Sequence, residues 1–507
     1  MSFARVFGAQ PALPVAHIVH VEADVGKGLH QFNVVGLPDK AVEESRDRVA
    51  SAIKNSGFKS PKHSNLKIVI SLAPAALKKE GASFDLPMAL TYLLAAEEIA
   101  FKPEGILFAG ELALDGSLRT IAGALSLAQA AKKAGFREMI VPEGNADEAA
   151  LVDGLIVRPA TTLLEVILHL TKATEHTLPE RTRRKLERPT EQFALLDEIR
   201  GQEGAKRALE IAAAGEHNIA FYGPPGTGKT MLARALASIL PPLTHDDMLE
   251  VTTIHSVAGT LHGTIHREAP FRSPHHTSSY ASIIGGGAIP RPGEVTLAHR
   301  GVLFLDEFPE FHRDVINALR EPLEDKVVSV SRARASHVFP ARFMLVAALN
   351  PCPCGFAGSN RCTCLPVAIE KYRKKISGPI ADRIDMWVHV GEIAPEALSV
   401  HTKKHTSHET ASARTRVQNA RIVQQNRFAS VKHTTTNASM KARDIETFAH
   451  LSSRAEQVLV DATRKLHLSS RGYHRTIKLA RTIADLVDAD IIEPEHMLEA
   501  LQYRQRD

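Results

Sequence analysis

The chain has 507 residues, of which 44% are apolar and 23% are charged, and its formal net charge is +5. A chain of this length folds as two to four domains, and this composition excludes an intrinsically disordered protein. The first 20 residues lack a signal-peptide pattern, and no segment reaches the roughly 20 consecutive apolar residues that span a bilayer. We therefore expect a cytoplasmic protein.

Charge is distributed unevenly along the chain. Residues 1–170 hold 17 basic and 19 acidic side chains, whereas residues 401–507 hold 18 basic and 12 acidic ones. A basic tail suits a polyanionic partner, although a solvated helix face explains the same excess.

The first third alternates short strand-like runs with helical patterns. We predict strands over 18–25, 31–35, 65–72 and 105–111, and helices over 41–56, 86–96 and 123–134. Residues 1–170 are therefore expected to form one mixed domain of helices and strands. Residues 171–192 are polar and basic and contain two prolines, so they are assigned as a linker.

A glycine-rich motif lies between a predicted buried strand, 218–222, and a predicted helix, 231–240. It matches G-x-x-x-x-G-K-[ST], in which backbone N–H groups surround phosphates, the lysine reaches the outer phosphates and the hydroxyl binds Mg²⁺. A glycine turn that only caps a helix is the alternative. The candidate ATP-binding residues are Gly223, Pro224, Pro225, Gly226, Thr227, Gly228, Lys229 and Thr230.

Polar side chains follow two later apolar strands. Asp306 and Glu307 end the run 301–305, where Asp306 can hold Mg²⁺ together with Thr230 and Glu307 can activate the attacking water. Asn350 ends the run 343–349 and is expected to hold the same water, unless it caps a helix. Strands that alternate with helices around the phosphate loop favour a mostly parallel sheet over residues 193–400.

Two arginines are candidates for stabilising charge on the γ-phosphate, because phosphoryl transfer needs a cation from outside the loop. Arg383 precedes the apolar run 386–390 and is placed to reach a neighbouring subunit. Arg471 begins a predicted helix and is expected to reach the phosphates of its own subunit. From composition alone, each would instead be expected to be a surface ion-pair residue.

All four cysteines fall within thirteen residues, as two Cys-x-Cys pairs separated by seven residues. Four thiolates on one short loop suit a structural Zn²⁺ site, and disulfides are disfavoured in a cytoplasm. Unligated thiols are the alternative. The candidate zinc ligands are Cys352, Cys354, Cys362 and Cys364.

The last part of the chain, residues 401–507, is predicted to be a helical subdomain, with helices over 411–428, 453–467, 470–487 and 494–503. The fold class expected for the whole chain is α/β.

Taken together, these motifs resemble the AAA+ ATPases, in the branch that holds the MCM helicases and the magnesium-chelatase motor subunit. Asp-Glu-Ile-Arg-Gly-Gln, ending at Gln202, is similar to box II. The phosphate loop resembles Walker A, Asp306-Glu307 Walker B and Asn350 sensor 1, while Arg383 and Arg471 resemble the arginine finger and sensor 2. The resemblance implies a P-loop core with an all-α lid.

Four further stretches narrow the resemblance to the bacterial ComM/YifB family, over nearly the full length. They are Asn-Val-Val-Gly-Leu-Pro-Asp at 33–39, Phe-Arg-Ser-Pro-His-His-Thr at 271–277, Ile-Gly-Gly-Gly-Ala-Ile-Pro-Arg-Pro-Gly-Glu at 284–294, and Asn-Pro-Cys-Pro-Cys-Gly at 350–355. The resemblance implies a hexameric, ATP- and Mg²⁺-dependent DNA helicase. Such a motor migrates branched recombination intermediates during natural transformation and works on single-stranded, double-stranded or branched DNA, beside a recombinase.

The resemblance also marks two insertions. The stretch 327–339 matches a hairpin that projects into the pore of the ring, with Arg332 and Arg334 near its turn as candidate DNA contacts. An ordinary charged hairpin tip is the alternative. The second insertion, 255–294, is rich in glycine and histidine, and no ligand is assigned to it.

The first domain resembles the α+β proteolytic domain of Lon, of the ribosomal-S5-like class, and Ser83 stands where that family's nucleophile aligns. A Ser–Lys dyad needs a lysine beside the hydroxyl. The matching helix start has none, and Lys132 and Lys133 lie about 10 Å further along the helix. We interpret the domain as a non-catalytic scaffold for DNA binding or assembly. A magnesium-chelatase-type motor that remodels a protein partner is the alternative function for the whole chain.

Overall fold

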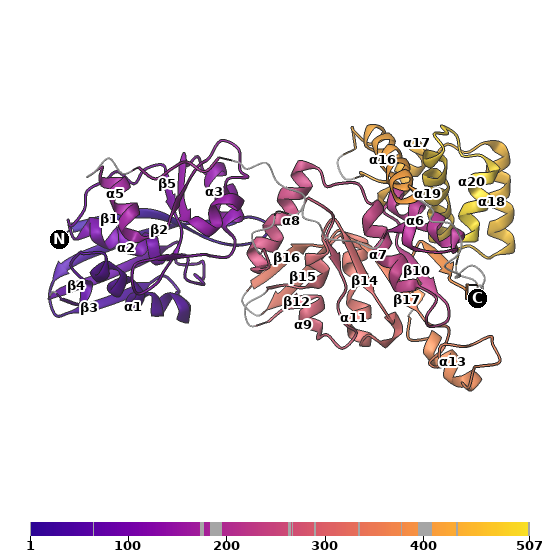
Figure 1. The fold of residues 1–507 in the computed structure, drawn as a ribbon, viewed down its shortest axis with the longest axis horizontal. Helices are drawn as coiled ribbons and strands as arrows, with labels where there is room; N and C mark the ends of the chain where they lie inside the picture. The colour runs from indigo at the N-terminus through magenta and orange to yellow at the C-terminus, as the bar shows by residue number, and fades with distance from the viewer. Residues whose placement is uncertain are drawn as a thin grey trace. The chain divides into compact units, whose positions relative to one another are not determined.

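The computed structural model describes residues 2–63, 65–172, 177–182, 195–261, 265, 267–287, 291–332, 335–376, 378–393, 408–431 and 434–504 (Figure 1). The chain divides into two compact units, Met1–Pro189 with Met248–Ile265, and Thr190–Asp247 with His266–Asp507. Most of the linker assigned from sequence, 171–192, lies outside the described residues.

The first unit contains a four-stranded sheet in the order β1-β2-β4-β3, built from β1 (Ser2–Gln10), β2 (His17–Lys27), β4 (Leu66–Ala73) and β3 (Gln31–Val35). Only β3 and β4 pair in parallel. Alternate residues of β2 are buried, as expected for a strand with one face on the core. Helices α1 (Lys40–Asn55) and α2 (Asp85–Ala95) pack against this sheet.

A second, parallel sheet of the first unit joins β5 (Ile106–Phe108), β8 (Glu138–Pro142) and β9 (Ile156–Ala160), and β6 (Glu111–Leu112) pairs with β7 (Leu118–Arg119). Its helices are α3 (Ala124–Lys133), α4 (Ala146–Ala149) and α5 (Leu163–Thr171). Thr162 and Glu165 form a capping box that sets the start of α5. This mixture of mostly antiparallel and parallel strands with helices is the α+β domain predicted from the sequence.

Helix α8 (His245–Ala258) belongs mainly to the first unit, although the sequence placed it inside the range 193–400. The Gly123 N–H donates to the Ser256 carbonyl at 3.0 Å, and the Thr253 hydroxyl lies 3.3 Å from Gln129 Oε1. The apolar pattern of this helix indicates a buried face but does not say which domain covers it.

The second unit is built on a five-stranded parallel sheet in the order β11-β14-β17-β10-β18. The strands are β11 (Phe271–Arg272), β14 (Val302–Leu305), β17 (Met344–Leu349), β10 (Ile219–Tyr222) and β18 (Met386–His389). Every residue of β14 and β17 is buried, because both faces of the sheet are covered. The parallel core predicted from alternating strands and helices is confirmed.

Helices and two hairpins surround this sheet. The helices are α6 (Glu203–Gly215), α7 (Lys229–Ile239), α9 (Tyr280–Ile283), α10 (Glu294–Leu297), α11 (Arg313–Ala318), α12 (Arg320–Asp325), α13 (Pro366–Arg373) and α14 (Gly378–Ala381). One hairpin pairs β12 (Gly285–Gly286) with β13 (Arg291–Pro292), and the other pairs β15 (Val327–Arg332) with β16 (Ala335–Pro340). In Figure 1, α13 projects from the sheet.

The chain ends in a helical lid of α16 (Glu409–Arg427), α17 (Ala442–Phe448), α18 (Ser453–Lys465), α19 (Ser470–Leu486) and α20 (Pro494–Gln502). Ser452 and Ser469 cap α18 and α19 by accepting backbone N–H bonds, which fixes where these helices begin. The helical subdomain predicted from the sequence is confirmed, with α17 as an additional short helix. Among the described helices, none combines the length and apolar character needed to cross a bilayer.

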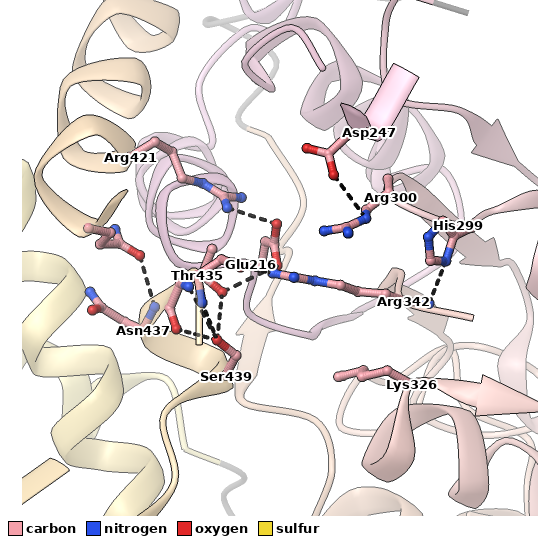
Figure 2. Close-up of polar contacts among 12 residues, drawn as sticks. Glu216, Asp247, His299, Arg300, Lys326, Arg342, Arg421, Thr435, Asn437 and Ser439 are labelled. Carbon is pink, nitrogen blue, oxygen red and sulfur yellow. Dashed lines mark hydrogen bonds and ion pairs between the residues drawn. The ribbon is translucent and has the colours of Figure 1, made fainter. Parts of the chain in front are cut away.

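A half-buried carboxylate links the lid to the core (Figure 2). Glu216, just after α6, accepts hydrogen bonds from Arg342 at 2.6 Å and from Arg421 of α16 at 2.8 Å. Burial alone would raise the pKa of Glu216, but the two guanidinium charges outweigh it and hold that pKa well below its ordinary value. The carboxylate therefore stays ionised across neutral pH, and the stability it contributes is lost only as the pH falls far below the ordinary glutamate range.

We expect Glu216→Gln to lower the free energy of unfolding by about 2 kcal/mol, because two guanidinium groups lose a charged acceptor. The measurement is the urea midpoint at neutral pH. Glu370→Gln is the control: its ion pair with Lys374 is exposed to solvent, so this variant should unfold at the wild-type midpoint. Equal midpoints for the two variants would contradict the role assigned to Glu216.

Candidate functional site

The glycine loop leaves β10 and enters α7 at the carboxyl end of the parallel sheet. Gly226 and Gly228 have φ of +78° and +90°, the left-handed region that favours glycine, and a Cβ atom at either position would meet no atom within 4 Å. The backbone is therefore open to a ligand at this point. Gly223 needs its small size for another reason, because a Cβ there would lie 2.0 Å from the Val390 carbonyl oxygen.

Lys229, the first residue of α7, directs its ammonium group into the loop. Nζ donates to the carbonyl oxygens of Gly223 and Pro224, each at 2.7 Å, and lies 3.1 Å from Asn350 Oδ1. Burial lowers the pKa of Lys229. A phosphate would offer this cation a full negative charge in place of neutral carbonyls.

The carboxyl end of β14 brings the two acidic candidates to the same place. Asp306 Oδ2 accepts a hydrogen bond from the Thr230 hydroxyl at 2.8 Å, so the two oxygens proposed as Mg²⁺ ligands are adjacent. Glu307 follows with φ of +51°. The structure thus brings together Lys229, Thr230, Asp306, Glu307 and Asn350 from three neighbouring strands, an arrangement suited to hydrolysis of a nucleoside triphosphate with Mg²⁺.

A histidine that the sequence analysis did not single out contacts the catalytic candidate Glu307. His276 Nδ1 lies 3.2 Å from Glu307 Oε2, and its ring lies against that of His275, tilted by 32° with the ring centroids 4.2 Å apart. Both histidines belong to the motif 271–277. Arg272, in the same motif, forms a bidentate ion pair at 2.6 and 2.8 Å with Glu294, the last residue of the insertion 255–294. The second insertion therefore contacts the hydrolysis site through His276.

The two candidate arginines lie together, away from the phosphate loop. Arg383 and Arg471 both pair with Glu324, the latter at 3.3 Å, and the guanidinium groups lower the pKa of that carboxyl, Arg383 most strongly. Arg383 precedes β18, whereas the phosphate loop follows β10, its parallel neighbour. These are opposite ends of the sheet, separated by at least the length of the strand, about 13 Å for four residues.

The position of Arg471 differs from the expectation that it reaches the phosphates of its own subunit. One turn further along α19, Arg475 donates to the Ile384 carbonyl at 2.9 Å and pairs with Asp385 at 3.2 Å. The start of α19 is therefore fixed at the amino end of β18. From there, Arg471 faces the same way as Arg383.

The four cysteines converge. The four Sγ atoms lie within 4.8 Å of one another, and Cys352 Sγ is 3.3 Å from Cys354 Sγ and 3.9 Å from Cys362 Sγ. Four sulfurs bound to Zn²⁺ at about 2.3 Å would be about 3.8 Å apart. The Ala357 N–H donates to Cys352 Sγ at 3.2 Å, and N–H groups of Phe356 and Thr363 lower the pKa of Cys354 to about 6, whereas the neighbouring cysteine sulfurs contribute to raising the pKa of Cys362 and Cys364. Such donors stabilise thiolates, which are the form that binds a metal.

The structure describes only one of the two hairpin arginines that are candidate DNA contacts. Arg332 ends β15, so it lies at the turn, and Arg334 lies outside the described residues. Strands β15 and β16 pair over six residues, which agrees with the hairpin expected at 327–339.

Ser83 lies buried in the first unit, and no described residue makes a hydrogen bond to its Oγ. The nearby buried lysine in sequence, Lys79, has its pKa lowered by burial, but its ammonium donates to the main-chain carbonyls of Gly36 and Pro74. Lys132 Nζ donates to the Gly154 carbonyl at 2.8 Å. The described lysines therefore give Ser83 no base at hydrogen-bond distance.

Comparison with known proteins covers nearly the whole chain. Three family models match in succession: Subunit ChlI of Mg-chelatase over residues 21–145, Magnesium chelatase, subunit ChlI over 195–399, and Magnesium chelatase, subunit ChlI C-terminal over 407–504. The chain is 42% identical over 492 residues to the uncharacterized protein YifB of Salmonella typhimurium, covering 96% of this chain and 94% of that protein.

Two further proteins are similar to this chain. The competence protein ComM of Haemophilus influenzae is 41% identical over 511 residues, with 99% of this chain and 98% of that protein covered. Lon protease 2 of Bacillus subtilis is 29% identical over 241 residues, which cover 41% of this chain and 42% of that protease.

Proposed function

Because this chain belongs to the ComM/YifB family of magnesium-chelatase-like AAA+ ATPases, we propose that it is an ATP-driven DNA helicase and branch-migration motor. In this proposal it assembles as a hexamer, hydrolyses ATP with Mg²⁺ and acts on recombination intermediates during natural transformation, beside a recombinase. The similarity to the competence protein of Haemophilus influenzae supports a role in competence.

One observation carries the mechanical part of the proposal: the hydrolysis site and the two arginines lie at opposite ends of the same sheet. An arginine that cannot reach its own phosphates is suited to reach those of a neighbour. Each active site is then completed at a contact between two copies, which favours a closed ring. Glu324, which pairs with both arginines, lies in the last turn of α12, three residues before the hairpin β15–β16 begins, so a change at that contact is passed to the hairpin.

The proposal is tested by measuring ATP turnover with and without branched DNA, and by displacement of a labelled strand from a four-way junction. We expect DNA to raise turnover several-fold and displacement to require ATP. A turnover rate that is the same with and without DNA would overturn the proposal. It would favour the alternative, a chelatase-type motor that remodels a protein partner.

We expect the double variant Arg332→Ala/Arg334→Ala to weaken DNA binding while keeping DNA-independent ATP turnover. If both guanidinium groups contact phosphates, the slope of log affinity against log salt should fall by about 2 for duplex DNA. The measurement is fluorescence anisotropy between 50 and 200 mM salt, with Arg373→Ala, an exposed arginine of α13, as the control. An unchanged slope would show that the hairpin does not grip the backbone.

The cysteine cluster binds Zn²⁺ in this proposal, in a structural role. Four protein ligands leave no open coordination position for chemistry, and the distances between the sulfur atoms suit tetrahedral coordination. The first unit serves as a non-catalytic scaffold for DNA binding or assembly, which is supported by the absence of a described base beside Ser83.

A further inference from the structure

The stretch from Asn350 to Gly355 connects the end of β17 to the first two cysteines, and it touches the phosphate loop at two points. Asn350 Oδ1 lies 3.1 Å from Lys229 Nζ. Five residues on, Gly355 packs so closely against Pro225 that a Cβ atom at Gly355 would lie 2.7 Å from Pro225 Cδ and 3.1 Å from Cγ. Cys352 and Cys354 stand between these two contacts.

The conformation of this stretch depends on the cysteine loop. Gly355 has φ of +86° and donates its N–H to the Cys352 carbonyl at 2.9 Å, so its position is fixed by the turn that carries Cys352 and Cys354. Cys352 is fully buried, and its sulfur accepts from Ala357. Without a metal, four thiol side chains hold this turn through weak contacts; a metal replaces those with four bonds of fixed length.

We propose that metal occupancy of the cysteine cluster controls nucleotide affinity, because the metal-closed loop holds Pro225 and Lys229 in the conformation that receives phosphates. The proposal rests on the Zn²⁺ site proposed above and adds a function to it. Coupling between two sites is reciprocal: if the metal raises the affinity for nucleotide, nucleotide raises the affinity for metal by the same factor. The metal state of the cell would then set how much of the motor is loaded with ATP.

The chain offers a matched pair of variants that separates the contact from the backbone strain. Gly358 lies in the same loop with φ of +90°, and a Cβ there would meet nothing within 4 Å. Gly355→Ala and Gly358→Ala therefore place the same side chain in the same left-handed region, and only the first pushes against the phosphate loop. Neither residue is a metal ligand.

The experiment measures zinc content by mass spectrometry and affinity for a fluorescent ATP analogue with Mg²⁺, on the full chain. We expect Gly355→Ala to retain zinc and to bind the analogue at least about fivefold more weakly than Gly358→Ala, the lower end of typical coupling between sites. Equal affinities in the two variants would overturn the proposal.

A second arm removes the metal. Cys362→Ser/Cys364→Ser alters the two ligands furthest along the chain from Pro225, and a chelator strips the wild-type protein. We expect weaker analogue binding in both cases, restored in the stripped protein by added Zn²⁺, and slower zinc loss to the chelator when ATP is present. Zinc-free protein that binds the analogue as tightly as the loaded form would overturn the coupling. Purified wild type without zinc would instead overturn the metal site, while the glycine pair still tests the contact.

Discussion

Glu307→Gln is expected to lower ATP turnover by about 10²- to 10⁴-fold while leaving nucleotide affinity close to that of the wild type. The glutamine keeps the size of the side chain and removes the carboxylate that accepts a proton from the attacking water. Lys229→Ala should give the other pattern, a loss of affinity, because its ammonium lies inside the loop against Asn350 and two carbonyls. Affinity is measured by equilibrium binding and turnover by phosphate release.

The matched control for this prediction is Glu310→Gln, an exposed carboxylate three residues further on that pairs with Lys375 at 2.9 Å. It should turn over ATP at the wild-type rate. If Glu310→Gln lost as much activity as Glu307→Gln, the assignment of Glu307 as the group that activates water would be wrong. If Glu307→Gln instead bound nucleotide poorly, its role would be in holding the ligand.

The hydrolysis site could be predicted from the sequence because its parts are local. The loop 223–230 is continuous in the chain, and Asp306 and Asn350 each follow a fully apolar strand. The carboxyl ends of parallel strands lie at one edge of the sheet, so residues that follow different strands meet there even when they are far apart in the chain. Lys229 and Asn350, for example, are 121 residues apart. The cysteine cluster was predictable for the same reason, since its four members lie on one loop.

The pairing of distant charges could not be predicted. Glu324 pairs with Arg383, 59 residues later in the chain, and with Arg471, 147 residues later. No periodicity in the sequence indicates the ion-pair partner of an exposed glutamate at a helix end. The sequence places Arg471 at the start of a helix but gives no sign of its pair with Glu324, because the register of α19 on β18 is set by Arg475 and Asp385. The sequence marks His276 only as part of the motif 271–277. Its contact with Glu307 depends on how the insertion folds back.

The arginine pair leads to the second large expected effect. Arg383→Ala should lower ATP turnover by about 10³-fold with nucleotide affinity preserved, because a cation on the γ-phosphate acts mainly in the transition state. Arg471→Ala should act in the same direction. Both effects are measured as turnover at saturating ATP in the presence of DNA.

A mixing experiment decides whether these arginines act between copies. Arg383→Ala subunits bind nucleotide but supply no arginine, whereas Lys229→Ala subunits supply the arginine but bind no nucleotide. In rings assembled at random from equal amounts, about one quarter of the contacts join an intact nucleotide site to an intact arginine, so the mixture should recover up to about one quarter of wild-type turnover. An arginine that served its own subunit would leave the mixture as inactive as either variant alone. Such a result would contradict the proposed ring assembly, because the separation of Arg383 from its own phosphate loop is the structural reason for proposing that assembly.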